Sequence, residues 1–460
     1  MNLQGLKIKK LFGEFDYEIA LNQEYGITIL SGPNGYGKTT ILNILYNLFN
    51  QRFDFFRELN FGNIVVNFLG ERQLNISKKN GQPKNVQTIQ IINGQQIVVA
   101  QSKPNIDIHI DLIQERICVE EFIYNADAEH KLIQGLSRIF PIQQIASDLF
   151  TDKRTGQNLS LKDFLEINID SMPQKTISLI DATKPTDKRN TQISNLLNSV
   201  SIYIIREQRL LKQNTQSFQT TNKNLQNFSN TINIYANELK NKISQKLAEA
   251  FQIAQERDST FPKRLIDYKD ALPEQIFKDR LKSLTDKQEQ LQSFKISTSI
   301  QGFTAYEGEN QRVLSVYLED AENKISVFDD LLKRLNLFVE LLEEKQFTLK
   351  SIKINSNQGV FITTKNGQPL NLTDLSSGEQ EELVLLYELL FRVQPNTLVL
   401  LDEPETSLHV VWQKTFIKDL VKIARVQNIS FLLATHSPQI INGRWDLTTD
   451  LHDLYESMNK

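Results

Sequence analysis

Hydrophobic and polar residues alternate with a period of two at the start of the chain. Residues 3–10 (LQGLKIKK) alternate as a half-exposed strand would, and residues 27–30 (ITIL) form a short apolar run that is typical of a buried strand. This run leads into SGPNGYGKTT (31–40) and then into ILNILYNLFN (41–50), whose apolar positions have helical spacing. The first fifty residues therefore predict two strands, a glycine-rich loop and a helix.

The next part of the chain is rich in short strand-like segments. Between residues 61 and 117 we expect a run of strands: NIVVNF, RQLNIS, TIQIING, QQIVVA and IDIHI. The Asn-Gly pairs at 80–81 and 93–94 predict hairpin turns between consecutive strands of this run. Residues 118–200 have a mixed, mostly helical pattern with a polar loop near 183–192, and SIYII (201–205) predicts another strand.

Three long segments then carry apolar residues at spacings of three and four. They span 229–257, 273–294 and 310–345, and they follow a polar stretch, 213–230, that fits either a surface loop or a disordered segment. The spacing favours a helical bundle or a short antiparallel coiled coil, and the core of an ordinary helical subdomain would have the same pattern. At 1.5 Å per residue the two longer helices would reach about 45–55 Å, so we expect a short arm.

The end of the chain alternates strand and helix. Residues 347–373 have strand character, and the segments after them predict helix, strand, helix and strand at 379–392, 397–401, 412–425 and 430–435. Together with the first fifty residues, this order indicates an α/β fold whose parallel sheet combines both chain ends. We therefore expect an N-terminal part of a head with a β-rich subdomain (1–208), a helical or short coiled-coil insertion (209–346) and a C-terminal part of the head (347–460).

Composition narrows the function classes. Hydrophobic residues make up 40% of the chain and charged residues 23%, as in a globular protein. Lys and Arg (52) nearly balance Asp and Glu (55), so the net charge of -3 argues against a surface that binds nucleic acid throughout, although a local basic patch stays compatible. The single cysteine, Cys118, excludes an internal disulfide and a cysteine-based zinc site. No apolar run reaches the roughly 18 residues of a membrane span, and the N-terminus lacks the apolar region of a signal peptide, so we expect a cytoplasmic protein without a membrane partner.

The glycine-rich loop carries the strongest chemical signal. GPNGYGKT (32–39) fits the pattern G-x-x-x-x-G-K-[ST] between a buried strand and a helix. Its glycines let backbone N–H groups wrap a phosphate at a helix N-terminus. Lys38 would reach the β- and γ-phosphates, and Thr39 would ligate Mg²⁺ through its hydroxyl. The motif thus predicts an ATP and Mg²⁺ site whose nucleotide-binding residues are Gly32, Asn34, Gly35, Gly37, Lys38, Thr39 and Thr40.

Two carboxylates follow the apolar strand LVLL (398–401). In a parallel sheet, ligands bind at the edge where the strands end, which is where Asp402 and Glu403 are expected. Asp402 would hold Mg²⁺ through its water shell. Glu403 would orient and polarise the attacking water as the catalytic base.

Two further motifs flank this strand. LSSGEQ (375–380) precedes a helix, and a Ser/Gly-rich turn at a helix start offers N–H groups and hydroxyls to an anion. LLATHS (432–437) is a strand that ends in a histidine, and at this edge of the sheet His436 would contact a γ-phosphate as a third catalytic residue beside Lys38 and Glu403.

In this order, the four motifs resemble those of the ATP-binding-cassette (ABC) superfamily of ATPases, over residues 1–45 and 370–440. The resemblance implies an α/β ABC-type P-loop ATPase head, a mixed sheet with helices, that carries an inserted helical or short coiled-coil arm. It also implies that LSSGEQ is the signature sequence, which binds the γ-phosphate of ATP held by another subunit. Each site then needs two protomers arranged head to tail, and the signature would contribute Ser376, Ser377, Gly378 and Glu379.

The superfamily also has a glutamine after a strand, just before the inserted helical domain. Gln208, after SIYII, resembles it and would contact both nucleotide and Mg²⁺, and Gln114 is the alternative. The aromatic residue that stacks on adenine would be Phe12 or Phe15.

DEPETSLH (402–409) and the later THSPQII resemble the soluble branch of the superfamily that includes RecF, the SMC-like proteins and the OLD nucleases. This branch usually has proline after the histidine of the first motif, where this chain has Val410. OLD nucleases carry a further nuclease domain, but only 24 residues follow His436 here, and the five histidines do not group like those of an HNH or zinc nuclease. We therefore expect any nuclease to be a separate chain.

The opening segment 11–40, with IREQRL (205–210) and DSTFPKRL (258–265), resembles stand-alone ATPases of bacterial anti-phage modules, either PARIS or Septu. The resemblance implies a homo-oligomeric ATPase that controls an effector, often a nuclease, in response to a phage-encoded trigger. In DSTFPKRL, Phe261-Pro262 could equally break a helix and cap a packing contact.

Three functions remain open at this point. The first is an ATP-driven sensor and scaffold in phage defence with an effector in trans. The second is a DNA repair or recombination ATPase of the RecF/SMC kind, for which DNA is a partner. The third, a transporter nucleotide-binding subunit, is disfavoured by the long insertion and by DEPETSLH.

Overall fold

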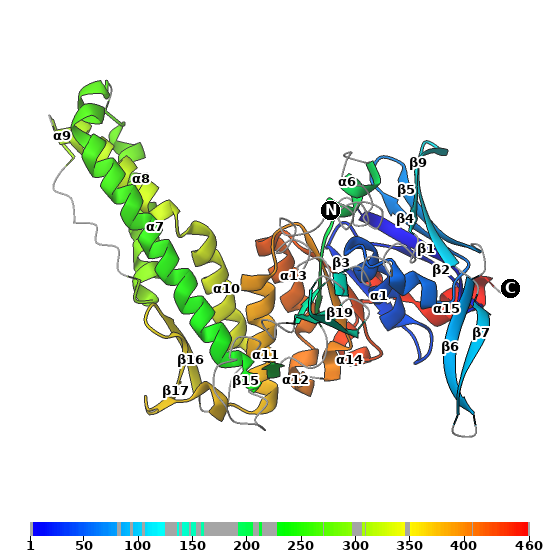
Figure 1. Ribbon diagram of the computed structural model, residues 1–460. Helices are drawn as coiled ribbons and strands as arrows, with labels where there is room; N and C mark the ends of the chain where they lie inside the picture. The colour runs from blue at the N-terminus through cyan, green and yellow to red at the C-terminus, as the bar shows by residue number, and fades with distance from the viewer. Residues whose placement is uncertain are drawn as a thin grey trace.

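The computed structural model describes residues 3–80, 84–92, 95–103, 106–124, 136–137, 140–146, 149–152, 158–160, 192–205, 211–213, 228–269, 271–296, 306–308, 310–345, 350–406 and 408–458. Figure 1 shows a head of sheets and helices and an arm of long helices that projects from it. None of the helices described is both long and apolar enough to cross a membrane.

A five-stranded sheet in the head combines strands from both ends of the chain. Every neighbouring pair is parallel, and the order is β13 (Ser201–Ile205), β19 (Thr397–Asp402), β20 (Ser430–Ala434), β3 (Ile27–Ser31) and β21 (Thr448–Asp450). Its central strands are apolar runs because both faces of the sheet are covered. The expected parallel sheet is confirmed. The structure adds β21, a short polar strand that the hydrophobic pattern did not predict.

A six-stranded antiparallel sheet forms the other half of the head. Its order is β2 (Phe15–Ala20), β1 (Leu3–Leu11), β4 (Asn63–Phe68), β5 (Arg72–Asn80), β8 (Ile106–Gln114) and β9 (Ile117–Tyr124). Helix α1 (Lys38–Phe49) packs between the two sheets, because Ile41 and Leu45 share one buried cluster with Ile8 of β1 and Leu400 of β19. The short helices α2 (Asp54–Glu58) and α6 (Gln192–Asn198) border this core.

One of the two predicted hairpin turns is correct. Strands β6 (Lys84–Ile92) and β7 (Gln95–Lys103) pair across residues 93–94 and form a separate two-stranded ribbon. The turn predicted at 80–81 is wrong, because β5 pairs with β8 instead of β6. Burial explains the choice: this pairing places Leu74 and Ile76 of β5 beside the fully buried side chains of β8.

The helical expectation for residues 118–200 is also wrong for the part that the structure describes. These residues are mostly strand and belong to β9, β10 (Ile142–Ala146), β11 (Leu149–Asp152) and β12 (Asn158–Ser160), and α6 follows. Pairing with a neighbouring strand outweighs the local pattern here, since β9 lies against β8, and β10–β12 pair among themselves. The loop expected near 183–192 lies outside the described residues except for Gln192, where α6 begins.

The expected arm is present and consists of α7 (Thr231–Asp267), α8 (Glu274–Ser293), α9 (Asn310–Ser326) and α10 (Asp329–Glu344). The pattern over 310–345 therefore corresponds to two helices. Helix α7 has 37 residues, which is about 55 Å. It continues through Pro262, so the helix break expected at Phe261-Pro262 is wrong.

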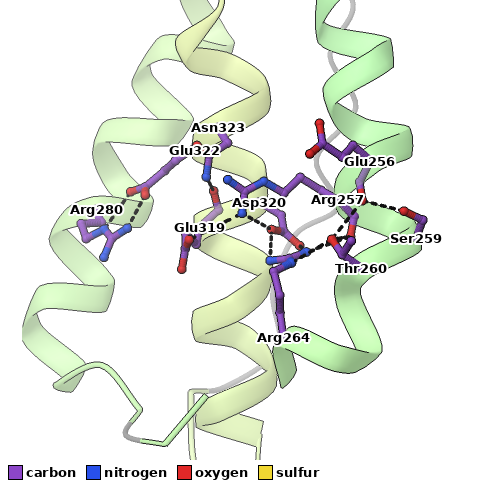
Figure 2. A network of polar contacts seen from close by, with 10 residues as sticks. All are labelled: Glu256, Arg257, Ser259, Thr260, Arg264, Arg280, Glu319, Asp320, Glu322 and Asn323. Atoms are coloured by element: carbon purple, nitrogen blue, oxygen red, sulfur yellow. Dashed lines mark hydrogen bonds and ion pairs between the residues drawn. The ribbon is translucent and has the colours of Figure 1, made fainter. Parts of the chain in front are cut away.

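Ion pairs tie the arm helices together near the outer end of α7 (Figure 2). Arg264 on α7 donates to both carboxylate oxygens of Asp320 on α9, and its Nη2 also donates to the backbone oxygen of Arg257 at 2.8 Å. Arg280 on α8 pairs with Glu322, also on α9. Because Pro262 lacks an N–H, the turn before it loses a helical hydrogen bond. The carbonyl left without this bond is that of Asp258, whereas Arg264 donates to the carbonyl of Arg257, one residue earlier.

The base of the arm packs against a small sheet and the C-terminal helices. The sheet contains β16 (Lys350–Asn355), β17 (Gly359–Thr364) and β18 (Pro369–Leu370). Strand β17 approaches α7 so closely that a Cβ on Gly359 would lie 2.0 Å from the backbone oxygen of Ala236, and the φ of Gly359 is +70°. The other elements here are β14 (Leu211–Gln213), β15 (Phe228–Asn230), α11 (Ser377–Tyr387), a π-helical turn (Glu388–Arg392), α12 (Val410–Gln413), α13 (Phe416–Gln427) and α14 (Pro438–Ile441). Helix α15 (Leu451–Met458) lies against β2 in the head.

A buried ionic cluster joins the arm to the head. Lys345, at the end of α10, lies 3.1 Å from Oε1 of Glu382 on α11 and 2.7 Å from Oδ2 of Asp419 on α13. All three side chains are at most 2% exposed. One ammonium group therefore links the last arm helix to two helices of the head.

Candidate nucleotide site

The glycine-rich loop joins β3 to α1 in the geometry expected of a phosphate-binding loop. Gly32, Gly35 and Gly37 have φ angles of +138°, +89° and +83°, which residues with side chains rarely adopt. Lys38 begins α1, and its Nζ donates to the backbone oxygens of Gly32 at 2.7 Å and Pro33 at 3.0 Å. The ammonium group thus lies across the loop, where incoming phosphate oxygens could replace the two carbonyl groups. Pro33, Asn34 and Gly35 are exposed, and Thr40 is half-buried.

Residues from both ends of the chain meet beside this loop. The hydroxyl of Thr39 on α1 donates to Oδ1 of Asp402 at 2.9 Å, at the end of β19. Hydroxyl and carboxylate oxygens are the ligands that Mg²⁺ prefers. In nucleotide sites, phosphate oxygens and water molecules complete its coordination shell. The contact between Thr39 and Asp402 therefore fits a Mg²⁺ ion held by these two residues.

Glu403 has an unusual backbone conformation. Its φ is +42°, which is rare for a residue other than glycine, and its N–H donates to the backbone oxygen of Ala434 at the end of β20 at 2.9 Å. The side chain is 28% exposed, and its Oε1 lies 3.7 Å from Nδ1 of His436. The adjacent ends of β19 and β20 thus bring together the predicted base and the predicted phosphate-binding histidine.

Glu405 also belongs to this group, although the sequence analysis gave it no role. Its side chain is 8% exposed, and its Oε1 accepts hydrogen bonds from the hydroxyl of Thr435 at 2.7 Å and from the backbone N–H of His436 at 3.0 Å. The same oxygen lies 3.3 Å from Nδ1 of His436. A second acid two residues after Glu403 was visible in DEPETSLH, but its contact with the histidine depends on strand pairing.

The signature segment starts α11 through a well-formed cap. Ser376 is the N-cap residue: its hydroxyl accepts from the N–H of Glu379, and the Glu379 carboxylate accepts from the N–H of Ser376 at 2.8 Å. Glu379 also pairs with Lys350 at 2.7 Å. Burial raises the pKa of Glu379, but the bonds from Lys350 and Ser376 outweigh it and hold the pKa below its usual value. Glu379 is therefore buried and occupied within the cap, whereas Ser376 and Ser377 are exposed and Gly378 is half-buried.

A single chain does not bring the signature to its own phosphate loop. Figure 1 shows α11 at the base of the arm, whereas α1 lies between the two sheets of the head. A concavity of about 620 Å³ includes Lys7, Arg72 and Arg116 on the antiparallel sheet, and none of the four motifs lines it.

The structure describes some, but not all, of the other residues predicted to contact the nucleotide. Gln208 lies outside the described residues, and the alternative, Gln114, ends β8 opposite Arg72 in the antiparallel sheet. Phe12 is 44% exposed and lies close to Gly37. Phe15 packs against the rings of Tyr36 and Tyr455 at 5.3 and 5.2 Å. Both aromatic residues are therefore near the loop, and the choice between them for adenine stacking stays a prediction.

Comparisons with known proteins add the family. No curated protein matches this chain. Among solved structures it resembles the Smc head domain with an extended coiled coil from Pyrococcus furiosus, bound to the C-terminal domain of ScpA, at 14% identity over 96% of this chain and 91% of that one, with a TM-score of 0.30. The SMC head domain from Thermotoga maritima matches at 13% identity over 96% and 91%, with a TM-score of 0.31.

The sheets and motifs described above define the fold. It is an α/β fold: an ABC-type P-loop ATPase head, with mixed sheets and helices, that carries a helical arm. A family model described as AAA ATPase domain matches residues 1–441, which is nearly the whole chain. The chain therefore belongs to the AAA ATPase domain family.

Proposed function

We propose that this protein is a Mg²⁺-dependent ATPase that serves as sensor and scaffold in an anti-phage defence system and controls a separate effector. One observation carries the ATPase part: Thr39, Asp402, Glu403 and His436 converge at the edge of the parallel sheet beside the phosphate loop. The defence role rests on the resemblance of the opening segment, IREQRL and DSTFPKRL to ATPases of PARIS and Septu modules. The proposed effector is a nuclease, and the proposed trigger is encoded by the phage.

In the proposed mechanism, Lys38 exchanges the carbonyl groups of Gly32 and Pro33 for the β- and γ-phosphates. Thr39 and Asp402 hold Mg²⁺, which supplies positive charge to the phosphate oxygens when bound. Glu403 orients the attacking water and accepts its proton, and His436 contacts the γ-phosphate. Gln208 is a further proposed contact to nucleotide and metal.

The proposed site is completed by a second copy of the chain. Ser377 is exposed at the start of α11, as a residue that acts on a neighbour's ATP should be. Figure 1 shows α11 at the base of the arm, away from α1, which follows the phosphate loop. We propose head-to-tail contacts that sandwich ATP, with residues 1–208 and 347–460 forming the head and 209–346 the insertion. Contacts of this kind that close on themselves would give a ring.

The central experiment uses Glu403→Gln, which should bind ATP but hydrolyse it about 10²–10⁴-fold more slowly, because the water loses its base. Light scattering after gel filtration should show a larger assembly with ATP and Mg²⁺ than without. The double variant Lys38→Ala/Glu403→Gln is the control, since it should stay small under both conditions. Hydrolysis by Glu403→Gln at the wild-type rate would contradict the role of Glu403.

Affinity purification of Glu403→Gln from its native host, with mass spectrometry and a nucleic-acid stain, then tests the defence role. A stoichiometric nuclease or toxin-like partner is the expected result. DNA together with repair proteins, and no effector, would instead favour a RecF/SMC-like ATPase. In that case duplex DNA should stimulate hydrolysis, with a steep dependence on salt.

A further inference from the structure

Tyr17 of β2 connects the antiparallel sheet to the phosphate loop. This tyrosine is only 1% exposed, and its hydroxyl donates to the backbone oxygen of Tyr36 in the loop at 2.9 Å. In the part of the chain that the structure describes, no other side chain from outside residues 32–39 hydrogen-bonds to residues 32–37. The hydroxyl of Tyr17 therefore holds the loop from outside.

The side chain of Tyr36 is also held, in a cluster of aromatic rings. Its ring lies 5.3 Å from that of Phe15 and 5.6 Å from that of His452, and Tyr455 of α15 packs against both Phe15 and Tyr36. Burial raises the pKa of Tyr17, so its hydroxyl stays protonated and remains a donor. Because Tyr17 is buried, water does not compete for this hydrogen bond, and the bond fixes the orientation of its acceptor.

Peptide geometry extends this effect to the next residue. The peptide bond between Tyr36 and Gly37 is trans and planar, so the oxygen of Tyr36 and the N–H of Gly37 point in opposite directions. With the oxygen directed toward Tyr17, the N–H of Gly37 is directed away from β2. Gly37 is the N-cap residue of α1, and none of the described residues accepts a hydrogen bond from its N–H. An unpaired N–H at the start of a helix is a donor suited to a phosphate oxygen.

We propose that Tyr17 is a positioning residue that, through the carbonyl group of Tyr36, holds the N–H of Gly37 toward the phosphates of a bound nucleotide. Tyr17 itself does not touch the nucleotide. The phosphate contact rests on the nucleotide site proposed above, whereas the hold on the peptide does not. The competing explanation is that the bond only satisfies a buried tyrosine hydroxyl.

Two variants that each lose a single hydroxyl separate these explanations. Tyr17→Phe keeps the ring and removes only the donor to the loop. Tyr455→Phe is the matched control, because it removes a hydroxyl from the same aromatic cluster whose acceptor, Glu14 at 3.2 Å, lies outside the loop.

The first test reads the peptide by NMR and needs no nucleotide. The sequence contains only two Tyr-Gly pairs, 25–26 and 36–37. With ¹³C in the tyrosine carbonyl groups and ¹⁵N in glycine, a carbonyl–amide correlation gives one signal for each pair, and Tyr36→Phe identifies the loop signal by its loss. Tyr17→Phe should shift the loop signal and leave the other in place, whereas Tyr455→Phe should move neither. An unchanged loop signal in Tyr17→Phe, or an equal shift in Tyr455→Phe, would overturn the proposal.

The second test adds ADP or ATP. The loop cradles the α- and β-phosphates, so either nucleotide should move the amide proton signal of Gly37 downfield. In calorimetry, Tyr17→Phe should bind both nucleotides about 3–10-fold more weakly, the effect of one weakened hydrogen bond, and Tyr455→Phe should bind them as the wild type does. Because only binding is lost, kcat should stay within about twofold while KM rises.

The outcomes distinguish this proposal from the proposed function. If nucleotide binds without moving the Gly37 signal, or if Tyr17→Phe binds as tightly as the wild type, the hydroxyl has only a structural role and the proposal is wrong. Such a role would lower the unfolding temperature without changing the affinity of the folded protein. If the wild type binds neither nucleotide, the proposed function fails and the phosphate contact with it, while the first test still shows whether Tyr17 holds the peptide.

Discussion

Replacing Lys345 with methionine should destabilise the junction between arm and head. The change keeps most of the side-chain volume but removes the ammonium group that Glu382 and Asp419 share at 3.1 and 2.7 Å. Two carboxylates, each at most 2% exposed, would then face each other without a cation. Removing one partner of a buried ion pair typically lowers the free energy of unfolding by about 3–5 kcal/mol, and we expect a loss of that size.

The chain offers a matched control on the same two helices. Lys422 on α13 also pairs with two carboxylates of α10, those of Glu340 at 2.6 Å and Glu344 at 2.7 Å, but its side chain is 25% exposed. Exposed ion pairs are screened by water and contribute about 0–1 kcal/mol each, so Lys422→Met should destabilise the junction far less. Both residues are lysines that pair with two carboxylates and link α10 to α13, although Glu382, one of the two partners of Lys345, lies on α11. The main difference between the two sites is therefore burial.

The loss should also depend on pH, with a definite sign. Burial raises the pKa of Asp419 even though Lys345 opposes the shift. Without the lysine, that pKa should rise further. A carboxyl group whose pKa is higher in the folded than in the unfolded state stabilises the fold below the unfolded pKa, about 3.9, and this contribution is lost as pH rises through the folded pKa. The deficit of Lys345→Met should therefore be smallest in acid and grow toward neutral pH.

Tryptophan fluorescence is a local assay for this junction. Trp412 donates through Nε1 to the backbone oxygen of Lys345 at 3.1 Å, and the second of the two tryptophans, Trp445, is 59% exposed and can be replaced by phenylalanine. Urea titrations followed by Trp412 then report unfolding around the cluster. If Lys345→Met and Lys422→Met lower the urea midpoint equally, or if the deficit shrinks toward neutral pH, the reasoning is wrong.

Further predictions concern the nucleotide, the interface and the arm. Lys38→Ala should weaken ATP binding by about 2–5 kcal/mol in calorimetry, since a buried charge contact is lost; unchanged affinity would contradict the phosphate-loop assignment. Ser377→Arg should leave nucleotide binding to the single chain intact but block hydrolysis and assembly, and normal ATPase activity would show that the signature does not act between chains. Arg264→Ala should lower the free energy of local unfolding of the arm by about 1 kcal/mol, measured as faster hydrogen exchange around Asp320. Lys246→Ala is the control and should leave the exchange rate unchanged. Equal exchange rates in both variants would show that Arg264 does not hold the arm helices together.

The sequence predicted the parallel sheet because its strands are continuous apolar runs that end in charged or glycine-rich motifs. The same logic identified the residues around the phosphate loop, and their roles stay predictions. It failed where pairing with distant residues decides the structure. Asn80-Gly81 has the composition of a hairpin turn, yet β5 pairs with β8, whose side chains are needed in the core.

Two further misses depend on contacts that a periodicity cannot show. Helix α7 continues through Pro262, and the ion pair of Arg264 with Asp320 ties this end of α7 to α9. Glu405 looks like an ordinary acid in a loop, and only the pairing of β19 with β20 brings it to His436.

The place of β3 in its sheet has a consequence for synthesis of the protein. This strand, which leads into the phosphate loop, lies between β20 and β21, and Ser31 donates to Asp450, 419 residues later, at 2.7 Å. At about 5–20 residues per second, a ribosome needs about 20–80 s to synthesise the residues between Ser31 and Asp450. For most of that time, neither the two strands that flank β3 nor Asp402, which Thr39 contacts, has been synthesised. Nascent or truncated chains should therefore neither bind nor hydrolyse ATP. The nucleotide site should form only once nearly the whole polypeptide has been made.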